Sequence, residues 1–194
     1  MNVFWFRRDL RVDDNKGFFE ALNSNSEVLP LFIFDKNIID ELPKDDARVS
    51  FIHERLDIID RELKKFGKNL AIFQGDPIAI IQQLISENQI EGVYTNHDYE
   101  PYAKNRDQKI SSILATKNIE FHTFKDQVIF EKSEVVKDDQ TPYVVFTPYS
   151  RKWKAKLTEN PIKSFFANFR THIRSDLYAT ERNFIRNQTE FHTS

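Results

Sequence analysis

Residues 3–15 decide the fold, and they read Val3-Phe-Trp-Phe-Arg-Arg-Asp-Leu-Arg-Val-Asp-Asp-Asn15. The apolar run at residues 3–6 predicts a buried strand, and the charges that follow it lead directly into a helix start. Charges in that position lie at the carboxyl edge of an α/β sheet, where such folds build their sites. Because charged side chains are not buried without partners, we expect four of them to face water, a partner domain or an anion, or to form a solvated cluster of ion pairs. These four are Arg7, Arg8, Asp9 and Arg11.

Strand-like and helix-like segments alternate through the first two thirds of the chain. Strands are predicted at residues 3–6, 28–34, 70–73, 92–95 and 120–124. Helices are predicted at residues 16–23, 47–66 and 102–117, and between the third and fourth strands. We expect Asp13 or Asp14 to cap the first helix, Gly67 to end the second, and Asp76 to cap the third. This alternation implies right-handed crossovers, so we expect an α/β fold: a Rossmann-like sheet of five parallel strands with helices on both faces.

The composition excludes several classes of site. The chain has no Cys, which removes disulfides, thiol nucleophiles and Cys-based metal sites and agrees with a cytoplasmic location. Its four Gly residues form no G-x-G-x-x-G or Walker motif. His97 has no second His at ligand spacing, and we expect no metal site. No apolar run reaches the length of a membrane span and the first strand begins too early for a signal peptide, so we expect a soluble protein.

The net charge of −2 is divided unevenly along the chain. Residues 151–194 hold nine Lys or Arg and four acids, a balance of +5, which leaves −7 for the residues before them. Such a basic tail either contacts DNA or is a solvated linker. In this carboxy-terminal linker extension we expect a short strand at residues 128–130, an aromatic turn segment at 141–149 and a helix from Asn160. One side of that helix would present Ile162, Phe166, Phe169 and Ile173 to something outside the sheet.

Charged residues also follow the second and fourth predicted strands. Asp98 and Glu100 stand between the fourth strand and a helix that Pro101 would begin, at the ligand edge of an open α/β sheet. Paired carboxylates there do acid–base chemistry, bind a metal or accept hydrogen bonds, and a capping and salt-bridge cluster is the alternative. We expect an apolar wall and further charges at the same edge, which would suit a flat heteroaromatic ligand. Those residues are Phe34, Asp35, Arg48 and Arg106.

Several further motifs stand in order along the chain. They are Phe4-Trp-Phe-Arg-Arg-Asp-Leu-Arg-Val-Asp-Asp-Asn15, Leu31-Phe-Ile-Phe-Asp35, Gln74-Gly-Asp-Pro77, Asn96-x-Asp-Tyr-Glu-Pro-Tyr102, Arg106-Asp107 and Pro142-Tyr-x-Val-Phe-Thr-Pro148. This series resembles the DNA photolyase and cryptochrome family. The resemblance implies that residues 1–130 are an amino-terminal α/β antenna domain and that residues 131–194 are the interdomain linker and the start of a helical FAD-binding domain that is missing here. Thr193 and Ser194 resemble the first contacts to the FAD phosphates.

The same resemblance bears on the antenna chromophore. Folate-binding members carry an Asn-Glu pair where this chain has Tyr102 and Ala103, which makes a folate the less expected ligand. The Asp-x-Glu-Pro-Tyr form resembles members that bind 8-hydroxy-deazaflavin, although these usually have Gly in place of Ala103. Their pocket corresponds to Phe34, Asp35, Arg48, Asp98, Glu100 and Arg106. Deazaflavin or FMN is therefore the expected antenna, and an empty pocket is the alternative.

The resemblance implies the light-harvesting domain of a deoxyribodipyrimidine photolyase. In such an enzyme the antenna passes excitation to FAD, and electron transfer then splits a cyclobutane pyrimidine dimer that has been flipped out of the DNA. The family's enzymes are carbon–carbon lyases, but without the FAD domain we expect no repair by this chain alone. Its expected partners are the FAD-binding helical domain and, through it, damaged DNA. The alternatives are a fragment of a cryptochrome blue-light receptor and a stand-alone α/β ligand-binding module.

Overall fold

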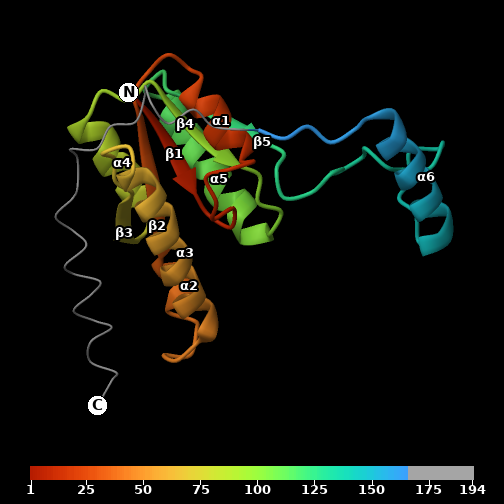
Figure 1. Cartoon of the computed structure of the whole chain (residues 1–194), viewed down its shortest axis with the longest axis horizontal. Coiled ribbons are helices and arrows are strands. Elements are labelled where there is room, and N and C mark those ends of the chain that lie inside the picture. The colour runs from red at the N-terminus through yellow and green to blue at the C-terminus, as the bar shows by residue number, and fades with distance from the viewer. Residues whose placement is uncertain (166–194) are drawn as a thin grey trace.

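The computed structural model describes residues 1–165, and its centre is a sheet of five parallel strands in the order β3-β2-β1-β4-β5 (Figure 1). The strands are β1 (Asn2–Phe6), β2 (Val28–Asp35), β3 (Ala71–Gly75), β4 (Gly92–Asn96) and β5 (Glu120–Phe124). The helices are α1 (Lys16–Leu22), α2 (Lys36–Ile39), α3 (Ala47–Lys64), α4 (Pro77–Glu87), α5 (Pro101–Ala115) and α6 (Phe146–Glu159). The predicted α/β class and five-stranded parallel sheet are confirmed, with small shifts at the ends of elements. No helix in this part of the chain combines the length and the apolar character that a membrane crossing requires.

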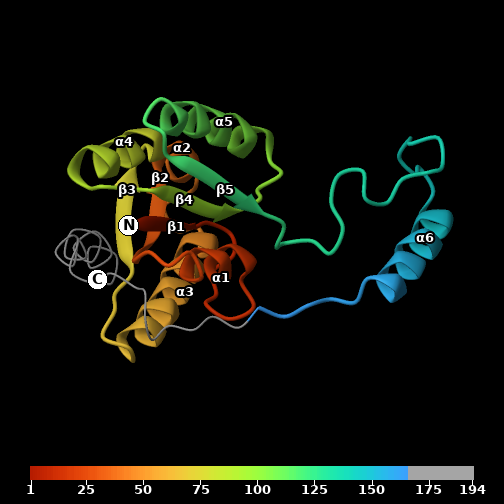
Figure 2. The same ribbon diagram turned by 90° about the horizontal axis from the view of Figure 1, so that it is seen from above.

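Helices cover both faces of the sheet (Figure 2). On one face α1 and α3 add Phe18, Leu56 and Ile59 to the buried apolar side chains of β1 and β2. On the other face α4 and α5 add Ile81 and Ile110. Both β1 and β2 are buried along their whole length, because a strand that is covered on both faces needs apolar side chains in both directions. The unbroken apolar runs of the sequence are the direct consequence.

The first helix begins at Lys16 as predicted, but its capping residue differs from the prediction. Asn15, and not Asp13 or Asp14, is the N-cap of α1, and its side-chain oxygen accepts a backbone hydrogen bond from the first turn. Asp14 has a left-handed backbone with φ of 51°, so the chain reverses there and leaves Asn15 extended at the cap position. The other two predicted signals are found in place: Asp76 caps α4, and Gly67 has a left-handed φ of 70° beyond the end of α3.

Beyond β5 the structure differs from several predictions. Residues 125–165, which we call the arm, run away from the sheet, form α6 and return toward α1 (Figures 1 and 2). The strand predicted at residues 128–130 is wrong, because the chain leaves the sheet after β5 and has no neighbouring strand to pair with. The turn predicted at residues 141–149 is wrong from Phe146 onward, where α6 begins. The helix predicted from Asn160 does not form within the described residues.

These errors have simple causes. Thr147 and Pro148 resemble turn residues, but they occupy the first turn of α6, where the missing N–H of a proline breaks no helical hydrogen bond. Helix α2 has no counterpart in the prediction, because its four residues are too few to show a helical period. Of the predicted apolar stripe, Ile162 is exposed. The other residues of that stripe and the two that resemble FAD contacts lie outside the described residues; they are Phe166, Phe169, Ile173, Thr193 and Ser194.

The strand order creates one switch point. Because β1 lies between β2 and β4, the two halves of the sheet grow in opposite directions from it. Loops that follow such neighbouring strands diverge, and α/β folds bind ligands between them at the carboxyl edge. The loops after β1, β2 and β4 are therefore the place where a site is expected.

Candidate functional site

A buried carboxylate lies at the carboxyl end of β2. Asp35 is 5% exposed, and its Oδ2 accepts hydrogen bonds from the Tyr102 hydroxyl at 2.8 Å and from Nη1 of Arg106 at 3.4 Å. Its Oδ1 accepts the backbone N–H of Asn37 at 3.0 Å and so caps α2. Burial and the Asp35 carboxylate raise the pKa of the Tyr102 hydroxyl, which therefore remains a donor at neutral pH. We call these four residues the Asp35 cluster.

Trp5 connects the Asp35 cluster to the end of β1. The guanidinium carbons of Arg106 and Arg7 lie 4.7 and 5.1 Å from the centre of the Trp5 ring. Asp107 accepts hydrogen bonds from Nη1 of Arg7 at 2.7 Å and from Nη2 of Arg106 at 3.2 Å. The Arg7 side chain is consequently buried against Asp107 and Trp5 and does not reach the surface.

Asp9 also lies inside, in a network that joins the loop after β1 to β4. Its carboxylate accepts hydrogen bonds from the side-chain amides of Asn96 and Asn15 and from the backbone N–H of Arg7. Oδ1 of Asn96 in turn accepts the backbone N–H of Gly17 at 2.9 Å, and a Cβ at Gly17 would lie 2.6 Å from that oxygen. The network holds this loop across the switch point and leaves room only for glycine at position 17.

Three charged side chains meet at the start of α5: Arg8, Asp98 and Glu100, which we call the rim. Nη1 of Arg8 lies 3.5 Å from Oδ1 of Asp98 and 3.4 Å from Oε1 of Glu100. The side chains of Arg8 and Glu100 are 56% and 63% exposed, and ion pairs this long and this exposed add little to stability. Glu100 is the N-cap residue of α5 but makes no capping hydrogen bond with its side chain. Arg8 and Glu100 are thus open to a ligand, whereas the Asp98 side chain is 10% exposed and also accepts the backbone N–H of Glu100 at 3.3 Å.

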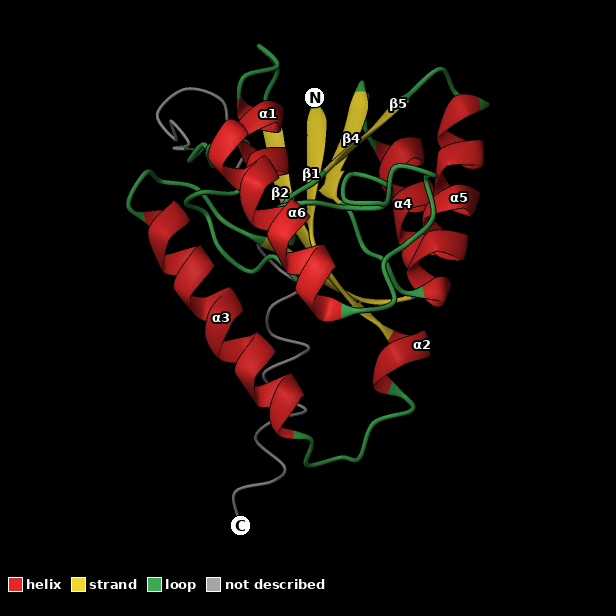
Figure 3. Ribbon diagram, turned by 90° about the vertical axis from the view of Figure 1, so that its right-hand side faces the viewer, coloured by secondary structure: helices red, strands yellow, loops and turns green. Residues whose placement is uncertain are grey.

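The structure does not bring Arg48 and Phe34 into contact with this rim. Arg48 is 70% exposed at the first turn of α3, where its Nε and Nη2 donate to Asp46 at 2.9 and 2.6 Å. These hydrogen bonds lower the pKa of Asp46 to about 2. Phe34 is buried, and His53 stacks on it with ring centres 4.6 Å apart. Figure 3 shows α2 and the loop to α3 at the lower end of the sheet, beyond the carboxyl ends of the strands.

Sequence reasoning missed the residues that hold the Asp35 cluster together. Tyr102 is four residues before Arg106 on α5, so both side chains lie on one helix face and reach Asp35. That spacing was visible in the sequence and is the signal that identifies Tyr102. Trp5 gave no such signal, because its contact with Arg106 depends on where α5 lies in the fold. The same holds for the hydrogen bond from Asn37 to the Tyr102 hydroxyl, although Asn37 contacts Asp35 locally.

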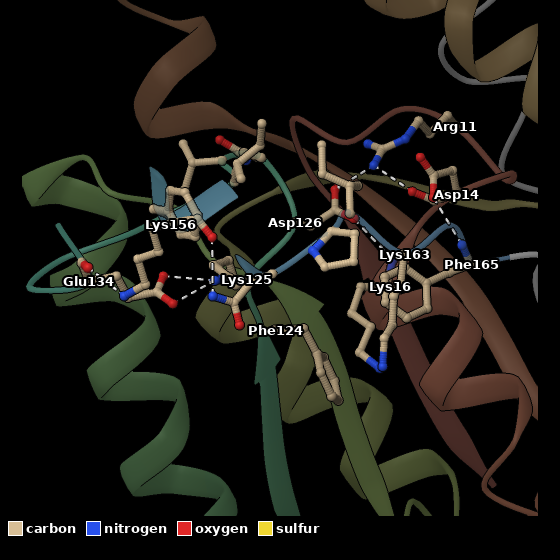
Figure 4. A pocket seen from close by; sticks show the side chains of 17 residues that line it. Arg11, Asp14, Lys16, Phe124, Lys125, Asp126, Glu134, Lys156, Lys163 and Phe165 are labelled. Carbon is tan, nitrogen blue, oxygen red and sulfur yellow. Dashed lines mark hydrogen bonds and ion pairs between the residues drawn. The ribbon is translucent and has the colours of Figure 1, made fainter. Parts of the chain in front are cut away.

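A groove lies at the same edge of the sheet, on the side of the arm. This groove has a volume of about 500 Å³ and is lined by the loop after β1, the residues after β5 and the end of the arm (Figure 4). Arg11 faces it and donates to Asp126 at 2.8 Å, while Lys125 donates to both oxygens of Glu134 at 2.7 and 2.8 Å. Figure 4 shows Lys156 converging on the same group, where it donates to the backbone oxygen of Glu134. Most cations of this groove are thus already engaged by groups of the chain itself.

Comparison with known proteins identifies the architecture. The family model described as DNA photolyase matches residues 2–167. A deoxyribodipyrimidine photo-lyase of a Synechococcus strain is 32% identical over 160 residues, which are 82% of this chain and 33% of that protein. The relatives that match also include proteins described as cryptochromes.

Solved structures show the same fold. A class III photolyase from Agrobacterium tumefaciens superposes with a TM-score of 0.77 at 26% identity, covering 89% of this chain and 35% of that one. An archaeal photolyase from Sulfolobus tokodaii gives 0.73 at 26% identity, covering 90% of this chain and 38% of that one, and is described with two FAD molecules and the implication of a novel light-harvesting cofactor. The chain therefore spans about a third of the length of these relatives.

Proposed function

The chain belongs to the DNA photolyase family, and we propose that it is the light-harvesting α/β domain of a deoxyribodipyrimidine photolyase, with a flavin-type chromophore bound at the carboxyl edge of its sheet. The observation that carries the proposal is that the Asp35 cluster and the rim both include residues at the start of α5 and differ in exposure. Asp35 and Arg106 are buried and pair with each other, whereas Arg8 and Glu100 at the rim are exposed and only loosely paired. To bind a polar ring system in one orientation, a site needs side chains that are fixed in place next to charges that are free to pair with the ligand.

The residues of the rim fit the polar edge of a flavin or deazaflavin ring. That edge presents one N–H donor between two carbonyl acceptors, so a carboxylate beside a guanidinium would complement it. Asp98 and Glu100 are the acceptors and Arg8 is the donor. Tyr102 is partly exposed beside them and offers an aromatic surface. Such a chromophore would supply absorption of near-ultraviolet or blue light, and the chain would supply its orientation.

The remaining functions of the family would reside outside the described residues. We assign residues 1–130 to the antenna domain and residues 131–194 to the linker and the start of an FAD-binding helical domain. That domain would hold FAD and bind damaged DNA, and this chain alone would have no repair activity. We assign the protein to the cytoplasm, a location with which the absence of Cys is compatible. A cryptochrome antenna domain would have the same site, so light-dependent repair by the protein joined to its FAD domain separates the two activities.

Chromophore uptake tests the proposal directly. The purified chain is incubated in separate samples with FMN, with 8-hydroxy-5-deazaflavin and with a folate, passed through gel filtration, and examined by visible absorbance. We expect a flavin-type ligand to stay with the protein and the folate to be lost. The double variant Asp98→Ala/Glu100→Ala should bind at least about tenfold more weakly, since it removes both acceptors.

A matched control keeps this result interpretable. Asp138 and Asp139 lie on the arm and are exposed, so Asp138→Ala/Asp139→Ala removes the same charge away from the rim. This variant should bind as the wild type does. Equal affinity in the rim variant and the control would refute the assignment of the rim, and loss of all three ligands by the wild-type chain would refute the antenna function.

A further inference from the structure

The loop between β4 and α5 has two faces. Alternate side chains of residues 97–100 contact different parts of the molecule. Asp98 and Glu100 face Arg8 and form the rim. His97 and Tyr99 face the arm, where both contact Glu131. One short segment is thus shared between the candidate chromophore site and the arm.

Glu131 is the point at which the arm holds this loop. Its Oε2 lies 2.8 Å from Nδ1 of His97 and accepts the Tyr99 hydroxyl at 2.8 Å. The other ring nitrogen of His97 lies 3.0 Å from the Thr123 hydroxyl, and the His97 backbone N–H donates to the oxygen of Phe124 at 2.7 Å. The imidazole is therefore fixed between β5 and the arm.

The arm in turn holds Glu131 in place. The backbone N–H of Glu131 donates to Oε2 of Glu134 at 2.7 Å, and the backbone N–H of Glu134 donates to the carbonyl oxygen of Glu131 at 2.9 Å. Lys125 and Lys156 both donate to Glu134, so the turn is tied to the residue that directly follows β5 and to α6. Burial would raise the pKa of Glu131, but the hydrogen bonds from Tyr99 and His97 outweigh it and the pKa is lowered. The carboxylate is thus ionised and a strong acceptor at neutral pH.

We propose that Glu131 is a positioning residue for the chromophore site: by holding His97 and Tyr99 it keeps Asp98 and Glu100 turned toward Arg8, and so couples the placement of the arm to the affinity of the rim. This inference rests on the proposed antenna function. Because such coupling is reciprocal, a chromophore that engages the rim also stabilises the attachment of the arm. An element joined to the arm would then sense whether the antenna is loaded.

Hydrogen exchange of the ligand-free chain tests the first half of the proposal. Glu131→Ala removes the shared acceptor, whereas Glu131→Gln keeps a neutral one. In Glu131→Ala we expect the amides of residues 97–100 and 131–134 to exchange at least about fivefold faster. In Glu131→Gln the change should be smaller. Asp138→Ala removes an exposed carboxylate of the arm whose ion pair with Lys152 is solvated and adds little to stability, so it should leave these rates unchanged. Unchanged rates in Glu131→Ala would overturn the proposed attachment.

Titration with FMN tests the second half. We expect Glu131→Ala to bind FMN roughly tenfold more weakly, Glu131→Gln to recover most of the affinity, and Asp138→Ala to match the wild type. A rescue by Gln is not expected of a residue whose only role is to stabilise the fold, and equal circular dichroism spectra establish that the variants are folded. Wild-type affinity in Glu131→Ala would overturn the positioning role.

The two measurements separate the possible failures. If the wild-type chain binds neither FMN nor deazaflavin, the antenna function is wrong and the positioning role is lost with it. The exchange rates then still decide whether Glu131 attaches the arm to the loop. If FMN binds and the exchange rates respond while affinity does not, the antenna function stands and the coupling alone is overturned.

Discussion

Two regions of the molecule are stabilised in different ways. The body, residues 1–124, encloses its apolar side chains in two layers on either side of the sheet. The arm contributes Val135 to the buried apolar residues, and α6 buries none of its side chains. The arm reaches the body mainly through polar contacts, such as Asp126 with Arg11 at 2.8 Å and with the Lys16 N–H at 3.0 Å.

This difference separates global from local stability. Apolar burial is cooperative, so the body should unfold as a unit. Point contacts between polar groups can open one at a time, so the arm should detach without unfolding the sheet. Coupling between the arm and the candidate site requires this combination, because the arm must be able to detach while the body stays folded.

The largest expected effect contrasts a buried with an exposed phenylalanine. Phe18 on α1 is fully buried against Phe4 and Phe6, with ring centres 5.1 and 5.2 Å away. Phe18→Ala should lower the free energy of unfolding by about 3–5 kcal/mol, as a large cavity in the body would. Phe146 on α6 is 77% exposed, and Phe146→Ala should change it by less than about 0.5 kcal/mol. Urea unfolding followed by circular dichroism measures both, and similar losses would show that the arm is part of the cooperative core.

The next effect concerns the switch point within the body. Gly17→Ala places a Cβ 2.6 Å from Oδ1 of Asn96 and 2.9 Å from a ring carbon of Phe4. Because both neighbours are buried and cannot move freely, we expect a loss of about 1–3 kcal/mol. The unfolding midpoint in urea measures it. A loss below that of Phe146→Ala would mean that the amide network around Asp9 is not rigid.

A smaller and local effect is expected at the joint between body and arm. Asp126 is buried and accepts hydrogen bonds from Arg11 and from the Lys16 N–H. Asp126→Ala should free the arm, with faster tryptic cleavage after Lys132 and Lys137 and a change of about 1–2 kcal/mol or less in global unfolding. Asp139→Ala is the control, because among residues 1–165 its carboxylate accepts hydrogen bonds from Thr141 in its own turn. Equal cleavage rates in the two variants would contradict the role of Asp126.

The smallest effect tests an exposed ion pair on the body. Arg48 lowers the pKa of Asp46 to about 2 through hydrogen bonds from its side chain and its backbone. A carboxyl whose folded pKa is depressed stabilises the folded state above its unfolded pKa and loses that contribution as the pH falls through about 2. Arg48→Met should raise the pKa of Asp46 toward its ordinary range, as read from carboxyl carbon shifts in NMR. An unchanged pKa would mean that the N-terminus of α3 holds the carboxylate without the guanidinium.

The sequence predicted the body better than the arm, for a physical reason. Strands such as β1 and β2 are apolar throughout because both faces of the sheet are covered, and that pattern is local. Helix α6 has no buried face that would impose a clear period, and its first turn holds Pro148. Where no core constrains the chain, turn and helix signals cannot be told apart from the sequence.

The candidate site divides in the same way. Asp35 and Asp98 follow predicted strands, which indicated the carboxyl edge of a parallel sheet, and Arg106 was expected near them because it lies one turn inside the next predicted helix. Their partners were hidden, because Arg7 and Asp107 lie 100 residues apart and Asp35 and Tyr102 lie 67 residues apart. Contacts at such separations depend on the strand order, which no local pattern contains.

The sequence alone determined that this chain is an α/β protein with charges at one edge of a parallel sheet. Each buried strand and the charged residues that end it are consecutive in the chain, so a local pattern reveals them. Only the tertiary structure decided which charges pair inside and which remain open. Arg7 and Asp9 are held in the interior, and Arg8 stays at the surface between Asp98 and Glu100. The reason is that β1 and β4 become neighbours only after the crossovers have formed, and their neighbourhood sets every distance between the loops that follow them.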